Sequence, residues 1–144
     1  MVIDASKVAD ILGGPRVLRR VVSNLAELQM AVIAGLPMES LDLTAEYVAA
    51  DLKDLSAIKD RLVPRATRSR RERLKLGEGE RVERLARLMA MAETVWEDED
   101  DARAFMNEPH PLMEGKSPIE MAESELGARR VEQLLMKLEY SLPV

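Results

Sequence analysis

Glycine and proline divide this chain into short segments of helix-forming residues, and no segment shows the alternation typical of a β-strand. Between the breakers, Ala, Leu, Glu, Arg and Met predominate, and these residue types favour helices. No Asn-Gly or Asp-Gly pair marks a hairpin turn. The sequence therefore predicts an all-α fold. Helices are expected at residues 5–12, 16–34, 38–52, 54–61, 64–75, 79–96, 99–107, 118–124 and 127–140.

Two segments of the C-terminal half have the apolar spacing of helices that cover a core. Val82, Leu85 and Leu88 recur at helical intervals, and the same pattern returns around Leu134. These side chains are expected to be buried. The stretch 117–120 has the order of a helix start, with a serine cap, a proline at the first helical position and a glutamate that reaches back.

The inventory of reactive side chains argues against an enzyme. The chain has no cysteine and a single histidine, His110. This excludes thiolate zinc sites and leaves histidine-based metal sites short of ligands. The acidic run at residues 97–101 lacks the glycine and the spacing of a calcium loop. We therefore expect no catalytic residue, no metal site and no cofactor.

No stretch of the sequence predicts a membrane span. Residues 30–38 are uncharged, but they contain Gly35 and Pro37 and fall far short of the roughly 20 residues that a spanning helix needs. Asp4 and Lys7 place charges where a signal peptide would be apolar. A cytoplasmic location is expected.

The net charge of −5 is unevenly distributed along the chain. Residues 59–75 carry eight basic and two acidic residues, for a net charge of +6. The flanking segments 1–58 and 76–144 have net charges of −3 and −8. Such asymmetry indicates an element that binds a polyanion, joined to a module with a different partner.

The basic segment has the layout of a helix-turn-helix. A short predicted helix at 54–61 is followed by Pro64, which suits the first position of a second helix that would enter the major groove. Arginine pairs with guanine edges and phosphates, and Ser and Thr donate to either. The alternative is a solvated charged helix, or a basic patch that meets the acidic C-terminal half. The candidate DNA-binding residues are Arg65, Thr67, Arg68, Ser69, Arg70, Arg71 and Arg73.

Residues 80–140 contain several motifs in a fixed order. An arginine-rich amphipathic segment at 81–88 is followed by the loop Gly115-Lys116-Ser117-Pro118 and the helix start Gly127-Ala128-Arg129-Arg130-Val131. In this order and spacing, the segment resembles the toxin-binding domain of Xre/MbcA/ParS-type antitoxins. Trp96-Glu97-Asp98 stands where that family has Phe-Gly-Asp, and His110 stands where it has asparagine.

The N-terminal half extends the resemblance. Gly35-Leu36-Pro37 resembles the start of the Xre-like helix-turn-helix domain, and Val63-Pro64 with Thr67, Arg70 and Arg71 resembles its recognition-helix motif. Arg68 replaces a leucine of that motif, and no glycine lies in the preceding turn. The resemblance implies an Xre-like DNA-binding and dimerisation domain at 1–76 and a toxin-binding domain at 77–144. Gly77-Glu78-Gly79 would form the boundary.

The resemblance implies a non-enzymatic antitoxin of a type II toxin–antitoxin system. Its partner would be a RES-domain toxin that consumes NAD, whose active-site cleft the C-terminal domain covers. The N-terminal domain of a homodimer would bind operator DNA in the promoter and repress the operon. Two alternatives remain: a stand-alone helix-turn-helix transcriptional regulator, and a toxin-binding module whose DNA-binding half has degenerated.

The last predicted helix and the tail supply the candidates for toxin contact. Two arginines begin this helix, where cations oppose the helix dipole, so an acidic partner surface would explain them. An intramolecular pair with Glu125 or Glu132 is the alternative. The tail is short and partly apolar and would suit a cleft. The candidate toxin-binding residues are Arg129, Arg130, Glu139, Tyr140, Leu142 and Val144.

Overall fold

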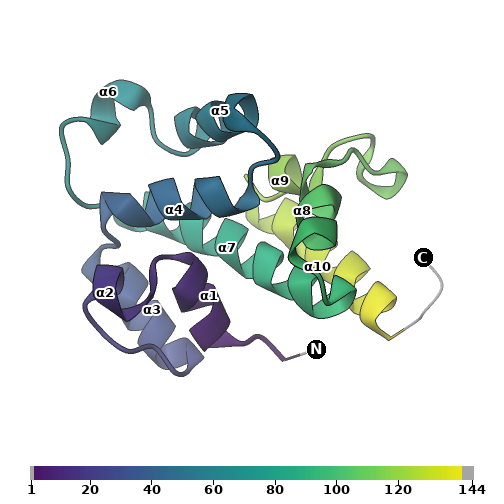
Figure 1. The fold of residues 1–144 in the computed structure, drawn as a ribbon, viewed down its shortest axis with the longest axis horizontal. Helices are drawn as coiled ribbons and strands as arrows, with labels where there is room; N and C mark the ends of the chain where they lie inside the picture. The colour runs from purple at the N-terminus through teal and green to yellow at the C-terminus, as the bar shows by residue number, and fades with distance from the viewer. Residues whose placement is uncertain (1, 141–144) are drawn as a thin grey trace.

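The fold is that of a computed structural model, which describes residues 2–140 as a bundle of helices (Figure 1). This part of the chain contains ten α-helices, one 3-10 helix and no β-strand, so the all-α prediction is confirmed. The helices are α1 Ala5–Ile11, α2 Gly14–Leu18, α3 Leu25–Ala34, α4 Met38–Val48, α5 Leu52–Leu62, α6 Arg65–Arg68, α7 Leu76–Trp96, α8 Glu99–Asn107, α9 Pro118–Met121 and α10 Glu125–Glu139. The 3-10 helix is Pro111–Met113.

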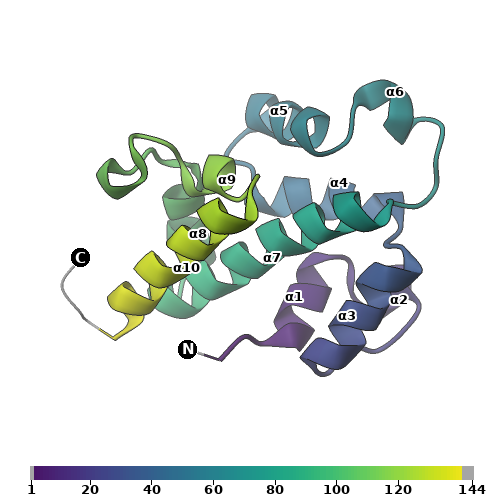
Figure 2. The ribbon, with the colours of Figure 1, turned by 180° about the vertical axis from the view of Figure 1, so that it is seen from behind.

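The long helix α7 is the centre of the molecule. It contacts α1, α3, α4 and α5 from the N-terminal half, and α8 and α10 from the C-terminal half. Figures 1 and 2 show it running through the middle of the bundle. Val82, Leu85 and Leu88 are buried, as their spacing predicts, and residues 89–92 are buried on every face. One continuous apolar core therefore includes residues from both halves of the chain.

Side chains that accept backbone hydrogen bonds begin most of the helices. Ser117 and Glu120 form the predicted capping box at α9, each accepting from the other's backbone N–H. Such caps satisfy donors that the first turn of a helix leaves free. The other side-chain N-caps of α-helices are Asp4, Asn24, Asp51, Asp98 and Ser124.

The single helix expected at 16–34 is wrong, because the chain breaks after α2. Arg19 adopts a left-handed conformation with φ of 55° and donates its N–H to the carbonyl of Pro15. A left-handed residue ends a helix. A new helix then begins at Asn24, which caps α3. The helices α4 and α9 also end a few residues before their predicted limits.

The helix expected at 64–75 is also wrong in length, because α6 has only four residues. Beyond it the chain is extended and pairs with the connection between α3 and α4. Met38 N–H donates to the carbonyl of Glu72, and Leu74 N–H donates to the carbonyl of Leu36, both at 2.8 Å. These bonds occupy backbone groups that a longer helix would need.

The two glycines of Gly77-Glu78-Gly79 do not form the expected loop, since both lie in the first turn of α7. Glu78 accepts a hydrogen bond from the backbone N–H of Lys75 at 2.8 Å and so fixes this helix start. Gly79 is buried, and a Cβ there would meet Val32 at 3.6 Å. Division of the chain into domains at 1–76 and 77–144 remains a proposal.

Candidate nucleic-acid and toxin interfaces

The helix α10 has a buried face and an exposed face. Val131, Leu134 and Leu135 are buried, and the helix packs against α7 and α9. On the opposite side Leu126 is 71% exposed and Met136 is 38% exposed. The exposed apolar side chains make this outer face a candidate for contact with another protein.

The two arginines at the start of α10 both form intramolecular ion pairs. Arg129 lies 3.5 Å from Glu125, which is one of the two partners considered from the sequence. Arg130 instead donates two hydrogen bonds, of 2.8 and 2.7 Å, to the carboxylate of Glu114 and one of 2.8 Å to the carbonyl of Leu112. The bonds from Arg130 lower the pKa of the Glu114 carboxyl. Arg130 thus fastens the 3-10 loop to α10, while both guanidinium groups remain accessible to a partner.

The other predicted toxin contacts lie at the end of the chain. Glu139 is the last residue of α10, and Tyr140 follows it with 57% of its surface exposed. Leu142 and Val144 lie outside the described residues. Tyr140 therefore directly follows the helix that carries the exposed apolar face.

Sequence reasoning missed Leu112 and Leu126 as candidate contact residues. Leu112 is half exposed in the 3-10 loop that Arg130 holds. Leu126 lies nine residues before Leu135, which places the two on opposite sides of a helix. An apolar residue off the buried stripe of a helix was the available signal for Leu126.

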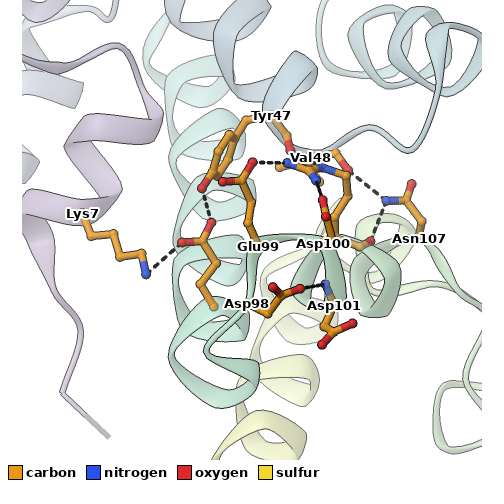
Figure 3. A network of polar contacts seen from close by, with 10 residues as sticks. Lys7, Tyr47, Val48, Asp98, Glu99, Asp100, Asp101 and Asn107 are labelled. Carbon is orange, nitrogen blue, oxygen red and sulfur yellow. Dashed lines mark hydrogen bonds and ion pairs between the residues drawn. The ribbon is translucent and has the colours of Figure 1, made fainter.

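The acidic run before and within α8 serves the fold. Asp98 caps α8 by accepting from Asp101 N–H at 2.8 Å (Figure 3). Glu99 and Asp100 both bind the guanidinium of Arg103, at 2.6 and 2.9 Å. Within residues 2–140, no group of three or more histidines and carboxylates is placed to hold a metal ion.

A polar network beside α8 joins the two halves of the chain (Figure 3). The Tyr47 hydroxyl of α4 donates to the carboxylate of Glu93 on α7, and Lys7 of α1 lies 2.8 Å from the same carboxylate. Arg103 of α8 donates to the Tyr47 carbonyl at 2.9 Å, and Asn107 donates to the Val48 carbonyl at 2.8 Å. The end of α4 is thereby tied to both α7 and α8.

Two of the candidate DNA-binding arginines are engaged inside the protein. Arg68 donates to Asp60 and to the carbonyl of Val63, both at 2.8 Å, and its side chain is only 15% exposed. Arg71 donates two hydrogen bonds to the carboxylate of Glu78. These two arginines stabilise the turn before α6 and the segment before α7.

The other candidate DNA-binding residues in this segment form no ion pair within the described chain. Arg70 and Arg73 donate only to backbone carbonyls, those of Ala66 and Gly35. Arg65 is exposed, and Ser69 donates its hydroxyl to the Ala66 carbonyl at 3.0 Å. Thr67 is partly buried.

Arginines without a carboxylate partner gather at one end of the molecule. Nine of the fifteen arginines form ion pairs with Asp or Glu of the described chain. The remaining six lie between α2 and α3, in and after α6, and near the start of α7, at the left of Figure 1 and the right of Figure 2. The opposite end is formed by the distal part of α10. The six are Arg19, Arg20, Arg65, Arg70, Arg73 and Arg81.

Comparison with known proteins finds a family model that matches part of the C-terminal region. Residues 91–140 match the antitoxin Xre/MbcA/ParS C-terminal toxin-binding domain. The resemblance to Xre-type antitoxins is confirmed. A curated relative, "Antitoxin Xre" of Pseudomonas putida, is 31% identical over 84 residues, which are 56% of this chain and 53% of the relative. The chain thus spans about half the length of that curated relative.

The match to the Xre-type toxin-binding domain begins inside a helix. It takes in the end of α7 from Met91, all of α8 and α9, and α10. The exposed residues Leu112, Leu126 and Met136 all fall within it. Among the described residues, no helix is long and apolar enough to cross a membrane.

Proposed function

We propose that this protein is the antitoxin of a type II toxin–antitoxin pair and neutralises a RES-type toxin that consumes NAD. The match of residues 91–140 to the Xre/MbcA/ParS toxin-binding domain carries this proposal. The exposed face of α10, with Leu126 and Met136, supplies apolar area that a partner would bury. The protein would act without catalysis, by covering the active-site cleft of the toxin.

Co-expression with a RES-type reading frame adjacent to its gene tests this proposal. We expect the two proteins to co-purify, cells to grow and cellular NAD to be retained. Leu126→Glu should weaken the complex, because it places a charge in the buried interface. Leu52→Glu is the matched control, since both leucines are exposed in the first turn of a helix and Leu52 lies on α5.

One result would count against the antitoxin role, and another only against α10 as the contact face. An adjacent RES-type protein that does not bind would contradict it and favour the stand-alone regulator. Equal loss of binding in Leu126→Glu and Leu52→Glu would remove α10 as the contact face while leaving the antitoxin role in place.

We further propose that the protein binds promoter DNA and represses its operon through the arginine-rich end. The support is the group of arginines without carboxylate partners, among them Arg65 and Arg70 in and after α6. A negative total charge is compatible with local attraction of phosphate, because salt screens the interaction between exposed charges that lie more than about 10 Å apart. Binding to a promoter duplex should weaken steeply as salt rises and should exceed binding to a random duplex. Absence of salt-dependent binding would favour the toxin-binding module with a degenerate DNA-binding half.

A homodimer is the third part of the proposal. The outer face of α3 is apolar and exposed at Leu25, Met30 and Ile33, and Val21 and Leu76 are also exposed. A second copy of the chain would cover such a face and would present two arginine-rich ends to a palindromic site. Light scattering should give a dimer for the wild type and a monomer for Ile33→Glu. A wild-type monomer would contradict this assignment.

A further inference from the structure

A pocket of about 370 Å³ lies between the α2–α3 connection, α3 and the extended segment before α7. Three of its lining side chains are arginines, Arg19, Arg20 and Arg73. The other described residues that line it are Leu, Ala, Gly and Pro, so no carboxylate offsets this charge. Such a pocket in an otherwise acidic chain suits an anion.

Long-range backbone pairing positions Arg73 at the pocket. The bonds Leu74 N–H to Leu36 carbonyl and Met38 N–H to Glu72 carbonyl flank Arg73 on both sides. Its guanidinium donates to the carbonyl of Gly35 at 2.8 Å. A guanidinium has five N–H donors, so this bond leaves others available to a ligand.

The chain turn after α2 supplies the other two arginines. Arg19 has a φ of 55°, a left-handed conformation that most residues with a side chain avoid. Non-glycine residues held in such conformations are frequent at binding sites. Within residues 2–140, the side chains of Arg19 and Arg20 make no ion pair and no hydrogen bond, and both are exposed.

We propose that this pocket binds a backbone phosphate of DNA. Guanidinium groups match phosphate oxygens with paired N–H donors, and three arginines line this one pocket. Arg73 belongs both to the pocket and to the basic segment 59–75, so the DNA would continue from this phosphate toward Arg70. The inference rests on the proposed DNA binding and extends its contacts to the α2–α3 connection, outside the basic segment.

The test compares the double variants Arg19→Gln/Arg20→Gln and Arg16→Gln/Arg129→Gln of the full chain. Both lower the net charge by two, but Arg16 and Arg129 have carboxylate partners and do not line this pocket. Affinity is measured against salt on a duplex from the operon's own promoter and on a random duplex. Loss of one phosphate contact should lower the slope of log K against log salt by about 1 on both duplexes. The control should keep the wild-type slope.

A second variant separates the fold from binding. Arg19→Gly removes the guanidinium but suits the left-handed backbone, so its melting temperature should equal or exceed that of the wild type. Its affinity for both duplexes should still fall. If both pocket variants kept the wild-type affinity and the wild-type slope of log K against log salt, the proposal that this pocket binds a phosphate would be overturned.

The outcomes distinguish the pocket from the proposed function. If Arg65→Gln/Arg70→Gln loses DNA binding while Arg19→Gln/Arg20→Gln does not, the pocket is wrong and DNA binding stands. If the wild type itself shows no salt-dependent binding, both are wrong. A loss confined to the promoter duplex would overturn the phosphate assignment, because phosphate contacts carry no direct sequence information.

Discussion

Arg71 and Glu78 form a two-pronged ion pair across the start of α7. The Nη1 and Nη2 atoms of Arg71 donate to the two carboxylate oxygens of Glu78 at 2.9 and 2.7 Å. Glu78 also accepts from the Lys75 N–H, so one carboxylate fixes both the helix start and the arginine before it. Arg71, which the sequence groups with the DNA-binding arginines, thus has a structural partner.

Substitutions of the neighbouring arginines Arg70 and Arg71 are therefore expected to have different effects on DNA binding and on melting temperature. Arg70→Gln removes an exposed guanidinium that donates only to the Ala66 carbonyl, so it should weaken DNA binding with little change in melting temperature. Arg71→Gln breaks the pair with Glu78 and should lower the melting temperature, with a smaller effect on DNA binding. Gel-shift titration and thermal melting measure the two effects. The reverse order of effects would show that the pair opens to engage DNA.

The contributions of Glu78 and Glu83 to the stability of the protein should change in opposite directions as pH falls. The hydrogen bonds from Arg71 hold the pKa of Glu78 below its usual range, so its contribution is present above the unfolded pKa of about 4.3 and is lost as pH falls through the folded pKa. Burial raises the pKa of Glu83, so stability is gained as pH falls from the folded toward the unfolded pKa.

Urea unfolding between pH 7 and pH 3 tests this contrast. The stability of the wild type relative to Glu78→Gln should decrease as pH falls, and its stability relative to Glu83→Gln should increase. Parallel trends for the two variants would contradict the environments assigned to these carboxylates.

Local signals predict the C-terminal region well. The stripe that includes Val131 and Leu134, and the capping box at Ser117, depend on residues within one or two turns, and the structure confirms them. The break after α2 has no such signal, because Arg19 takes up its left-handed conformation without a glycine or a proline.

The features that the sequence did not predict depend on contacts between residues that are distant in the chain. The extended segment before α7 pairs with Leu36 and Met38, more than thirty residues earlier in the chain. The arginine partners Asp60, Glu78 and Glu114 lie seven to sixteen residues from Arg68, Arg71 and Arg130. These pairs do not have the i,i+3 or i,i+4 spacing by which ion pairs within a helix are recognised in a sequence. The sequence could therefore group the arginines by charge, but it could not show which of them form ion pairs inside the protein.

Tyr47 and Lys7 should be energetically coupled through Glu93. Both bind the same carboxylate, whose side chain is only 10% exposed. Burial, together with the hydrogen bond to Glu93, raises the pKa of Tyr47, which keeps its hydroxyl a donor. Tyr47→Phe should cost about 2 kcal/mol, the range for hydrogen bonds to charged groups.

A double-mutant cycle with Lys7→Met measures the coupling. The double variant should lose more stability than the two single variants together, because the Glu93 carboxylate is then left without both partners. Repeating the cycle in Glu93→Gln should reduce the coupling. Strict additivity in the original cycle would show that the two contacts are independent.

Two helical glycines should respond in opposite ways to alanine. A Cβ at Gly127 would lie 2.1 Å from the backbone oxygen of Met121 and 2.8 Å from Oγ of Ser124, the cap of α10. Gly127→Ala must therefore displace the turn between α9 and α10 and should cost about 3 kcal/mol or more, as for other overpacked sites. At Gly77, also in a first helical turn, an added Cβ would meet nothing within 4 Å.

Gly77→Ala should accordingly stabilise the protein by about 0.5–1 kcal/mol, since alanine loses less conformational freedom than glycine on entering a helix. Urea denaturation of the two variants measures both changes. Because the contact of Gly127 lies between α9 and α10, Gly127→Ala should also weaken toxin binding, whereas Gly77→Ala should leave it unchanged. A destabilising Gly77→Ala would indicate that residues 77–79 need the freedom of a linker and would count against their place in the first turn of α7.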